Sequence, residues 1–302
     1  MNNVTHCGYV ALIGRPNVGK STLLNRLLGQ KLSITSRKPQ TTRHRILGIQ
    51  TLENQQIVFV DTPGIHKQTQ HALNQYMVSA ATSTMEDVDV LIFVVDARYW
   101  THEDDNVLER LQTIRKHHPK MPVLLVLNKV DRVLDKQSLL PQLESWQQKF
   151  EFAEMIPLSA KSGFNVENLQ KALTKYIPEG PFFFPEDQVS DRSERFFAAE
   201  MVREKLMRYT GDEVPYGLTV EIEEFKLKNN ILHVSALIWV ERAGQKTIII
   251  GKEGAMMKEI GRLARLDMER MFEHKVFLRL WVKVKEGWSD DARALKSLGY
   301  EG

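Results

Sequence analysis

Short apolar runs alternate with polar turns and amphipathic segments through the first part of the chain. Tyr9–Ile13, Ile57–Val60 and Val123–Leu127 are apolar throughout, which is typical of strands buried on both faces of a sheet. Thr22–Leu28 has the spacing of a helix with one apolar face. Alternation of this kind predicts an α/β domain, with a mostly parallel sheet covered on both faces, that extends to about Ile177.

The pattern changes after Pro178. Glycine, proline and polar residues without periodicity predict a linker over residues 179–190, between a first domain of residues 1–178 and a second of residues 191–302. In the second domain, Asp191 and Glu194 resemble a capping box for a helix that ends at Tyr209. Strand-like segments follow at Leu218–Phe225, Ile231–Val240 and Val276–Val284, so we expect a smaller α+β domain.

Residues 14–21 match the phosphate-binding pattern G-x-x-x-x-G-K-[ST] in full. The loop follows a predicted strand and opens a predicted helix, whose free amides and positive dipole end suit phosphate. Lys20 would bind the β- and γ-phosphates, and the Ser21 hydroxyl would take a magnesium position. The predicted contacts are Gly14, Arg15, Pro16, Asn17, Val18, Gly19, Lys20, Ser21 and Thr22.

Three further motifs follow strands in order. Asp61-Thr62-Pro63-Gly64 offers a carboxylate for hydrated Mg²⁺ and a Gly64 amide to sense a γ-phosphate. In Asn128-Lys129-Val130-Asp131, a carboxylate can accept bonds from guanine N1–H and its exocyclic amine, which adenine cannot offer together. The amides of Ser159-Ala160-Lys161 can reach guanine O6.

The order and spacing of these motifs resemble a TRAFAC-class P-loop GTPase domain over about residues 5–178. The resemblance implies that Asn128 and Asp131 read guanine, that the Lys129 stem packs along the base, and that Ser159, Ala160 and Lys161 close the pocket. Residues 38–43 resemble the first switch, whose threonine closes on Mg²⁺. We assign that role to Thr42 rather than Thr41, which makes Ser21, Thr42 and Asp61 the predicted metal ligands.

The sequence has no catalytic glutamine where Ras-type enzymes carry one, because Ile65 stands there. We therefore expect slow basal hydrolysis that depends on Lys20, Thr42, Gly64 and Asn17. In related GTPases an asparagine at the position of Asn17 helps to hold K⁺, although Asn17 can instead only cap the loop. His66 and Lys67 are interpreted as surface residues rather than catalytic groups.

Gly251-Lys252-Glu253-Gly254 matches the G-x-x-G loop of KH domains, which clamps about four nucleotides of single-stranded RNA. From Arg242 to Lys285 there are 11 Lys and Arg against 5 Asp and Glu, whereas the rest of residues 191–302 has 9 against 14. Such asymmetry is typical of a phosphate-binding surface. The predicted RNA contacts are Ile249, Ile250, Gly251, Lys252, Glu253, Gly254 and Lys258, although Ile249 and Ile250 can equally belong wholly to the core.

A P-loop GTPase followed by a type II KH domain is similar to the bacterial Era family over nearly the whole chain. The resemblance implies binding near the 3′ end of small-subunit (16S) ribosomal RNA during subunit assembly, with partial association to the inner membrane surface. The alternatives are a nucleotide-dependent scaffold without useful turnover and a double-GTPase factor. The second is disfavoured because the chain has one phosphate loop.

The composition indicates the cellular compartment. The chain has 302 residues, 42% of them apolar, a net charge of +3 and Cys7 as its single cysteine. No disulfide can form within it, and a reducing cytoplasm is the expected compartment. We find no leader and no apolar run long enough for a membrane span, and we expect a monomer.

Overall fold

The computed structural model describes residues 4–64, 72–135, 137, 139–211, 214 and 217–300. The chain divides into two compact units. The described parts of residues 1–33, 42–69 and 77–191 form the first, and those of residues 34–41, 70–76 and 192–302 form the second. The second unit therefore includes two segments that come from within the sequence of the predicted GTPase domain.

A six-stranded sheet forms the centre of the first unit. Its order is β2-β3-β1-β4-β5-β6, and all neighbours are parallel except β2 and β3. The mostly parallel α/β fold is thus confirmed, with β2 as an additional antiparallel edge strand. The strands are β1 (His6–Ile13), β2 (Ile46–Leu52), β3 (Gln55–Asp61), β4 (Val90–Asp96), β5 (Val123–Asn128) and β6 (Glu154–Pro157).

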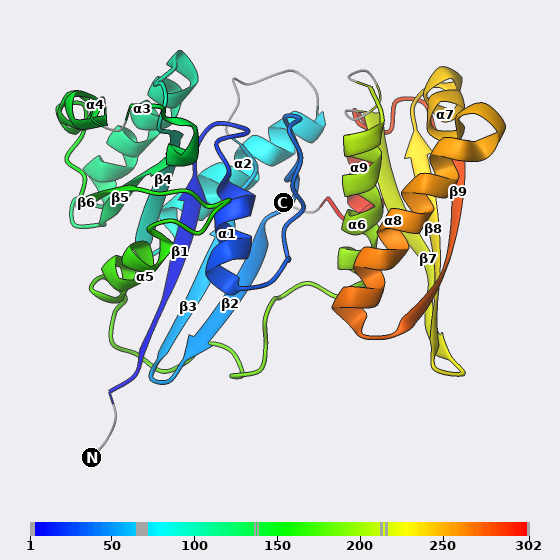
Figure 1. Cartoon of the computed structure of the whole chain (residues 1–302), viewed down its shortest axis with the longest axis horizontal. Helices are drawn as coiled ribbons and strands as arrows, with labels where there is room; N and C mark the ends of the chain where they lie inside the picture. Colours follow the sequence, from blue (N-terminus) through cyan, green and yellow to red (C-terminus); the bar gives the residue numbers. More distant parts are fainter. Residues whose placement is uncertain are drawn as a thin grey trace. The chain divides into compact units, whose positions relative to one another are not determined.

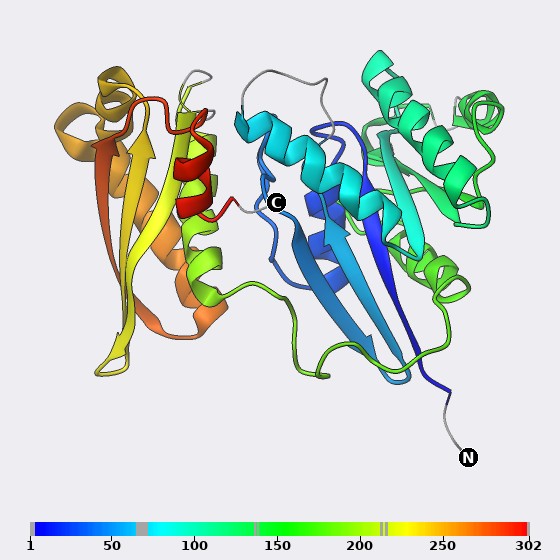
Figure 2. The ribbon, with the colours of Figure 1, turned by 180° about the vertical axis from the view of Figure 1, so that it is seen from behind.

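Helices cover both faces of this sheet. One core cluster joins one face of the sheet to apolar residues of α2, α3 and α4, and a second joins the other face to α1 and α5. Figure 1 shows α1 and α5 in front of the sheet, and Figure 2 shows α2 and α3 from behind. The helices are α1 (Lys20–Leu28), α2 (Ala72–Glu86), α3 (His102–His117), α4 (Leu139–Gln147) and α5 (Val166–Thr174). Because parallel strands end at the same edge, the motifs that follow β1, β3, β5 and β6 converge there.

The linker is bound to the first unit along its length. Gln56, which is fully buried on β3, accepts the amides of Phe183 and Phe184 at 2.9 and 3.0 Å. The Phe183 ring stacks on Tyr9 with centroids 5.2 Å apart. These contacts hold the linker against the first sheet.

The second unit has a three-stranded sheet of order β7-β8-β9, with β7 and β8 antiparallel and β8 and β9 parallel. Helices α6 and α8 lie on one face of it, in contact with each other (Figures 1 and 2). The elements are α6 (Glu194–Tyr209), β7 (Leu218–Lys228), β8 (Ile231–Val240), α7 (Ala243–Ile250), α8 (Ala255–Phe272), β9 (Lys275–Val284) and α9 (Ala292–Ser297). The α+β type II KH fold is confirmed, with a helix, α7, that the sequence pattern did not predict.

The capping box predicted at Asp191 is wrong. The N-cap of α6 is Ser193, whose hydroxyl accepts the amide of Phe196 at 3.3 Å. The Asp191 carboxylate instead accepts the amide of Leu47 on β2 at 3.1 Å. Among the described residues, no helix is long and apolar enough to cross a membrane.

Candidate functional site

The phosphate loop has the backbone of an anion cradle. Gly14, Asn17 and Gly19 have φ values of 147°, 61° and 102°, and the amides of such a loop turn inward. A Cβ on Gly14 would lie 2.4 Å from the carbonyl oxygen of Val94, and one on Gly19 would lie 2.4 Å from the Asn128 amide nitrogen. Glycine is therefore required at both positions. Helix α1 begins directly after Gly19 and has no side-chain cap within the described part of the chain, which leaves its first amides available for a phosphate.

Lys20 is buried within this loop. Its Nζ donates to the carbonyl oxygens of Gly14 and Arg15 at 2.9 and 3.1 Å. Burial lowers the pKa of Lys20 to about 8, although the nearby Asp61 carboxylate opposes the shift. Arg15 is held separately, since its Nε lies 3.0 Å from the buried Asp104 carboxylate. Among the residues that the structure describes, no carboxylate is in hydrogen-bond contact with the Lys20 ammonium group, which suits a phosphate site.

Three predicted magnesium ligands meet beside the loop. The Ser21 hydroxyl lies 2.8 Å from Asp61 Oδ2 and 2.9 Å from the Thr42 hydroxyl, and Thr42 lies 3.4 Å from the same carboxylate. Asp61 Oδ1 is buried and has no hydrogen-bond partner among the described residues. Burial also raises the pKa of Asp61, an effect that a bound cation would offset. Two hydroxyls and a carboxylate oxygen fit Mg²⁺ that also binds phosphate and water.

Thr41 is placed differently from Thr42. Its hydroxyl donates to the Lys38 carbonyl at 2.7 Å and lies 2.7 Å from Ser36 Oγ, within residues 34–41. This placement supports our assignment of Thr42 to the metal. Gly64 approaches the phosphate loop so closely that an added Cβ would lie 2.8 Å from Pro16 Cγ. Ile65, His66 and Lys67 lie outside the described residues.

Asn128 ties two loops to the end of β5. Its Nδ2 donates to the Val18 carbonyl at 2.8 Å, and its Oδ1 accepts the amide of Ala160 at 3.0 Å. The next residue, Lys129, has φ of 68° and donates from Nζ to the Asn17 carbonyl at 2.5 Å and to Asp96 at 3.0 Å. Asn128 and Lys129 therefore fix the phosphate loop against the predicted base pocket.

The predicted base reader is held at the surface of this pocket. Asp131 is exposed, and its Oδ1 accepts the Ser159 hydroxyl at 2.6 Å. No described residue bonds to its other oxygen, which is therefore available to a ligand. Ser159 in turn anchors the loop through its carbonyl, which accepts the amide of Gly163 at 2.9 Å. Asp131 and the Ser159–Lys161 loop are thus brought together as the motif order predicted.

Two supporting residues were not apparent from the motifs. Arg26 on α1 donates to the carbonyl oxygens of Ala160 and Lys161 at 3.1 and 2.7 Å, which fixes the peptide planes that carry the amides of Lys161 and Ser162. Asp96 is the last residue of β4. Burial raises the pKa of its carboxyl group, but the hydrogen bonds from Arg98 and Lys129 have the larger effect and hold that pKa well below its usual range. Asp96 directly follows the buried run Val90–Val95, so its position at a strand end was the signal available in the sequence.

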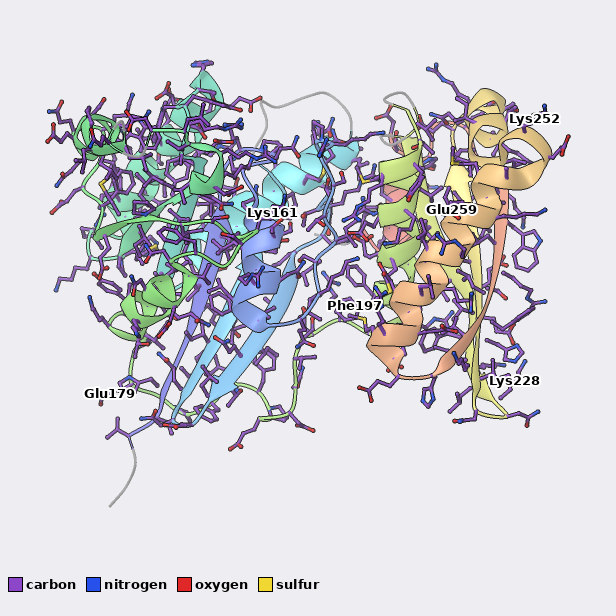
Figure 3. The ribbon with its side chains drawn as sticks, in the orientation of Figure 1. Lys161, Glu179, Phe197, Lys228, Lys252 and Glu259 are labelled. Carbon is purple, nitrogen blue, oxygen red and sulfur yellow. The ribbon has the colours of Figure 1, made fainter. Side chains whose placement is uncertain are left out.

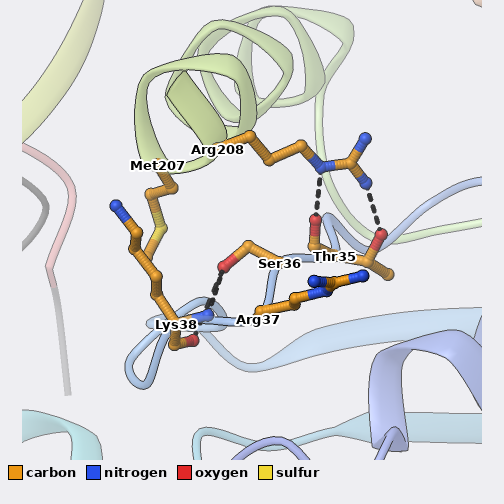
Figure 4. A pocket seen from close by; sticks show the side chains of 6 residues that line it. All are labelled: Thr35, Ser36, Arg37, Lys38, Met207 and Arg208. Atoms are coloured by element: carbon orange, nitrogen blue, oxygen red, sulfur yellow. Dashed lines mark hydrogen bonds between the residues drawn. The ribbon is translucent and has the colours of Figure 1, made fainter. Parts of the chain in front are cut away.

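Residues 34–41 form an anchored segment of the second unit. The Thr35 amide donates to Glu204 at 2.9 Å, and Arg208 donates to the Thr35 carbonyl and hydroxyl at 2.9 and 2.8 Å. Arg203, 1% exposed, donates to the Thr41 carbonyl and to Glu200. Figure 4 shows Arg208 and Met207 of α6 facing Thr35, Ser36 and Lys38 across a pocket. Both ends of the segment are thus bound to one helix.

The G-x-x-G loop joins α7 to α8, with Lys252 at its tip (Figure 3). Gly251, Glu253 and Gly254 have φ values of 69°, 51° and 76°. Ile249 is fully buried, so we assign it to the core and no longer to RNA contact, whereas Ile250 is partly exposed. Of the two alternatives left open for Ile249, its position on α7 with a buried side chain favours the core.

A groove runs beside the loop along α8 and β9. Apolar groups from both elements form part of it, and three basic side chains of α8 border it. Arg262 and Arg265 are paired with Glu259 and Glu269 at 2.8 and 3.2 Å. Its lining residues are Met257, Lys258, Gly261, Arg262, Arg265, Leu278 and Leu280. An apolar floor with a basic border is the chemistry that a single-stranded nucleic acid needs.

Comparison with known proteins gives matches to both units. A family model described as "50S ribosome-binding GTPase" matches residues 9–129, and a "KH domain" model matches residues 213–289. The chain is 58% identical to the GTPase Era of Pseudomonas putida over 99% of this chain and 98% of that protein. It is 59% identical to the GTPase Era of Pseudomonas aeruginosa over 98% of this chain and 95% of that protein.

Two solved structures are similar over the whole chain. One is a single-residue variant of Aquifex aeolicus Era bound to GDP·AlF₄⁻, with a TM-score of 0.93, 41% identity, and coverage of 99% of this chain and 100% of that one. The other, with the same values, is Era in complex with MgGDPNP and nucleotides 1506–1542 of 16S ribosomal RNA.

Proposed function

Because this chain belongs to the Era family of GTPases, we propose that it is a GTP-hydrolysing switch that binds 16S ribosomal RNA near its 3′ end and acts in small-subunit assembly. The observation that supports the proposal is that one chain combines a phosphate loop, Asp61, Asn128 and Asp131 with a G-x-x-G domain. A relative of the same two-unit structure holds MgGDPNP and nucleotides 1506–1542 of 16S ribosomal RNA.

In this proposal the first unit binds GTP through four groups of contacts. The loop amides and Lys20 hold the phosphates, while Asp131 reads guanine and Ser159, Ala160 and Lys161 close on its O6. Ser21, Thr42 and Asp61 would hold Mg²⁺, which supplies positive charge beside the phosphates. Asn128 and Lys129 keep the two halves of the site in register, through bonds to Val18, Ala160 and Asn17.

Hydrolysis needs alignment and charge compensation more than a covalent group from the protein. Lys20 is placed to neutralise charge on the β- and γ-phosphates, and the Gly64 amide to meet the γ-phosphate. Because residue 64 has no Cβ to meet Pro16, its amide can lie close to the phosphate loop. We expect slow turnover without a partner.

Turnover with and without RNA tests the proposed function. We expect multiple-turnover GTP hydrolysis to rise by about tenfold when the 1506–1542 fragment is added, which needs the activation free energy to fall by only about 1.4 kcal/mol. Phosphate release is the measurement, and a scrambled RNA of equal length is the control. A single turnover without stimulation would favour the rival function, a GTP-dependent scaffold that recruits a partner through its basic domain.

We also propose that K⁺ binds near Asn17 and adds charge beside the transferring phosphoryl group. Asn17 is held at φ of 61°, with its carbonyl bound by Lys129. Hydrolysis should then be at least about tenfold faster in KCl than in NaCl, since charge supplied at this place has large effects in GTPases. Asn17→Gly, which keeps the left-handed backbone and removes the side chain, should abolish the difference. Equal rates for the unsubstituted protein would refute the assignment.

The remaining assignments concern location and assembly. We propose that the protein is a cytoplasmic monomer with peripheral contact to the inner face of the membrane. The net positive charge of residues 242–285 supports attraction to anionic lipid as well as to RNA.

A further inference from the structure

The three-stranded sheet of the second unit has a face that α6 and α8 do not cover. Strand register places alternate residues of β7, β8 and β9 on this outer face. One end, at Thr219, is covered by the Tyr300 hydroxyl at 3.1 Å. The outer face consists of Thr219, Glu221, Glu224, Lys226 and Lys228 on β7, Ile231, His233, Ser235, Leu237 and Trp239 on β8, and Lys275, Phe277, Arg279, Trp281 and Lys283 on β9.

Large aromatic side chains on this face are open to solvent. Phe277 is 49% exposed and Trp281 is 43% exposed, although both rings lie on a regular strand. Trp239 is partly exposed on the neighbouring strand. Aromatic rings left this exposed cost hydrophobic free energy, and on a rigid strand they provide flat surfaces for another planar group.

Basic groups alternate with these rings. The Arg279 guanidinium lies 5.8 Å from the Phe277 ring centroid and 5.4 Å from that of Trp281. The ammonium groups of Lys283 and Lys285 each lie 5.8 Å from the Trp239 ring. Cations held over aromatic rings can meet phosphates while bases stack on the rings.

The acidic residues of the face are already compensated. Glu224 is paired with Lys228 at 2.7 Å and with Arg279 at 2.8 Å, which holds its pKa at about 2. Glu221 accepts the indole N–H of Trp239 at 2.9 Å. The outer-face positions of the three strands comprise five Lys and Arg against two Glu, so the charge complements a polyanion.

Strand β9 connects this face to the groove of the proposed RNA site. It is an edge strand, and its successive side chains point to opposite sides. Leu278 and Leu280 line the groove beside α8, while Phe277 and Trp281 are on the other side of the same strand. An RNA strand that leaves the groove around the β9 edge reaches the aromatic rings within a few nucleotides.

We propose that the outer face of β8 and β9 is a second RNA-binding surface, on which Phe277 and Trp281 stack bases and Arg279 and Lys283 bind phosphates. The inference rests on the proposed function, because it extends the RNA strand that the groove holds. The surface is sequence-tolerant, since every base has a face that can stack.

The test compares two RNA lengths by fluorescence anisotropy. A single strand of about five nucleotides occupies only the groove, whereas the 1506–1542 fragment can reach both surfaces. The double variant Phe277→Thr/Trp281→Thr should bind the long fragment about 30- to 100-fold more weakly, through the loss of two stacks. Its affinity for the short strand should equal that of the unsubstituted protein. Threonine keeps a strong strand preference at both positions.

Two further variants separate loss of contact from loss of fold. Leu227→Thr replaces another exposed apolar strand residue, 53% exposed, whose cross-strand partner Leu232 is buried on the helix side. It should leave both affinities unchanged. The conservative pair Phe277→Tyr/Trp281→Phe should keep the affinity for the long fragment. Arg279→Gln should reduce the slope of log affinity against log salt by about 0.7 for that RNA.

An unchanged affinity of the double variant for the long fragment would overturn the inference. The inference would also be overturned if the double variant kept its RNA affinity but no longer associated with purified small subunits. In that case the outer face would bind a ribosomal protein. If the unsubstituted protein binds neither RNA, the proposed function itself fails. The two failures are distinguishable. If the double variant still binds the long fragment more tightly than the short strand, as the unsubstituted protein does, only the second RNA-binding surface is refuted.

Discussion

The Asp131→Asn variant should lose GTP affinity by at least about 10²-fold and gain affinity for xanthosine triphosphate. The carboxylate can accept both guanine donors, and hydrogen bonds to a charged group contribute about 1.5–3 kcal/mol each. An asparagine amide instead offers one acceptor and one donor, which match N1–H and the C2 carbonyl of xanthine. The measurement is the dissociation constant of each nucleotide in competition with a fluorescent GDP analogue.

A nearby aspartate provides the matched control. Asp135 is an exposed aspartate four residues further along the chain, outside the predicted base-binding motifs. Its carboxylate accepts the amide of Gln137 at 2.9 Å. Asp135→Asn removes the same charge and should leave the preference for GTP intact. The assignment of Asp131 as base reader is wrong if Asp131→Asn retains the GTP affinity of the unsubstituted protein.

The Gly254→Asp variant should lose RNA affinity by about 10²-fold or more while it keeps GTP affinity. Gly254 has φ of 76° and open space around its α-carbon, and aspartate tolerates that backbone better than most residues. The new carboxylate would therefore stand in the loop that clamps phosphates, where it repels them. Anisotropy of the labelled 1506–1542 fragment at physiological salt is the measurement.

Gly244→Asp is the control for charge and for glycine replacement. Gly244 also has open space around its α-carbon, and it lies in the first turn of α7, where a carboxylate is well tolerated. This variant should reduce RNA affinity only slightly. Equal losses for the two variants would show that net charge, rather than the G-x-x-G loop, governs RNA binding.

The sequence motifs predicted which residues of the candidate nucleotide site lie together, because each motif follows a strand of one mostly parallel sheet. The converging ends of β1, β3 and β5 bring together residues 14–21, Asp61 and Asn128 without any knowledge of their contacts. The motifs could not predict the side chains that hold the loops of the site in place. Arg26 donates to the carbonyl oxygen of Ala160, which lies 134 positions later in the sequence. The sequence around Arg26 shows only an arginine on an amphipathic helix, and this does not predict the contact.

The wrong predictions share a physical cause. Asp191 has the spacing of a capping box, but a stronger partner, the amide of Leu47, lies 144 positions away and captures its carboxylate. Helix α7 was not predicted, because the β-branched run Ile248–Ile250 at its end has a modest strand preference; the burial of Ile249 in the core favours the helix there. In both places a tertiary contact decided between local alternatives of similar free energy.

The bound linker has a consequence for the edge of the first sheet. Strand β2 is an edge strand, and the linker bonds to it: the Ile49 amide donates to the Val189 carbonyl at 2.9 Å, and the Ser190 hydroxyl donates to the Leu47 carbonyl at 2.6 Å. An edge strand with unpaired backbone groups is a site where another chain can pair. The linker therefore protects this edge of the first unit against aggregation.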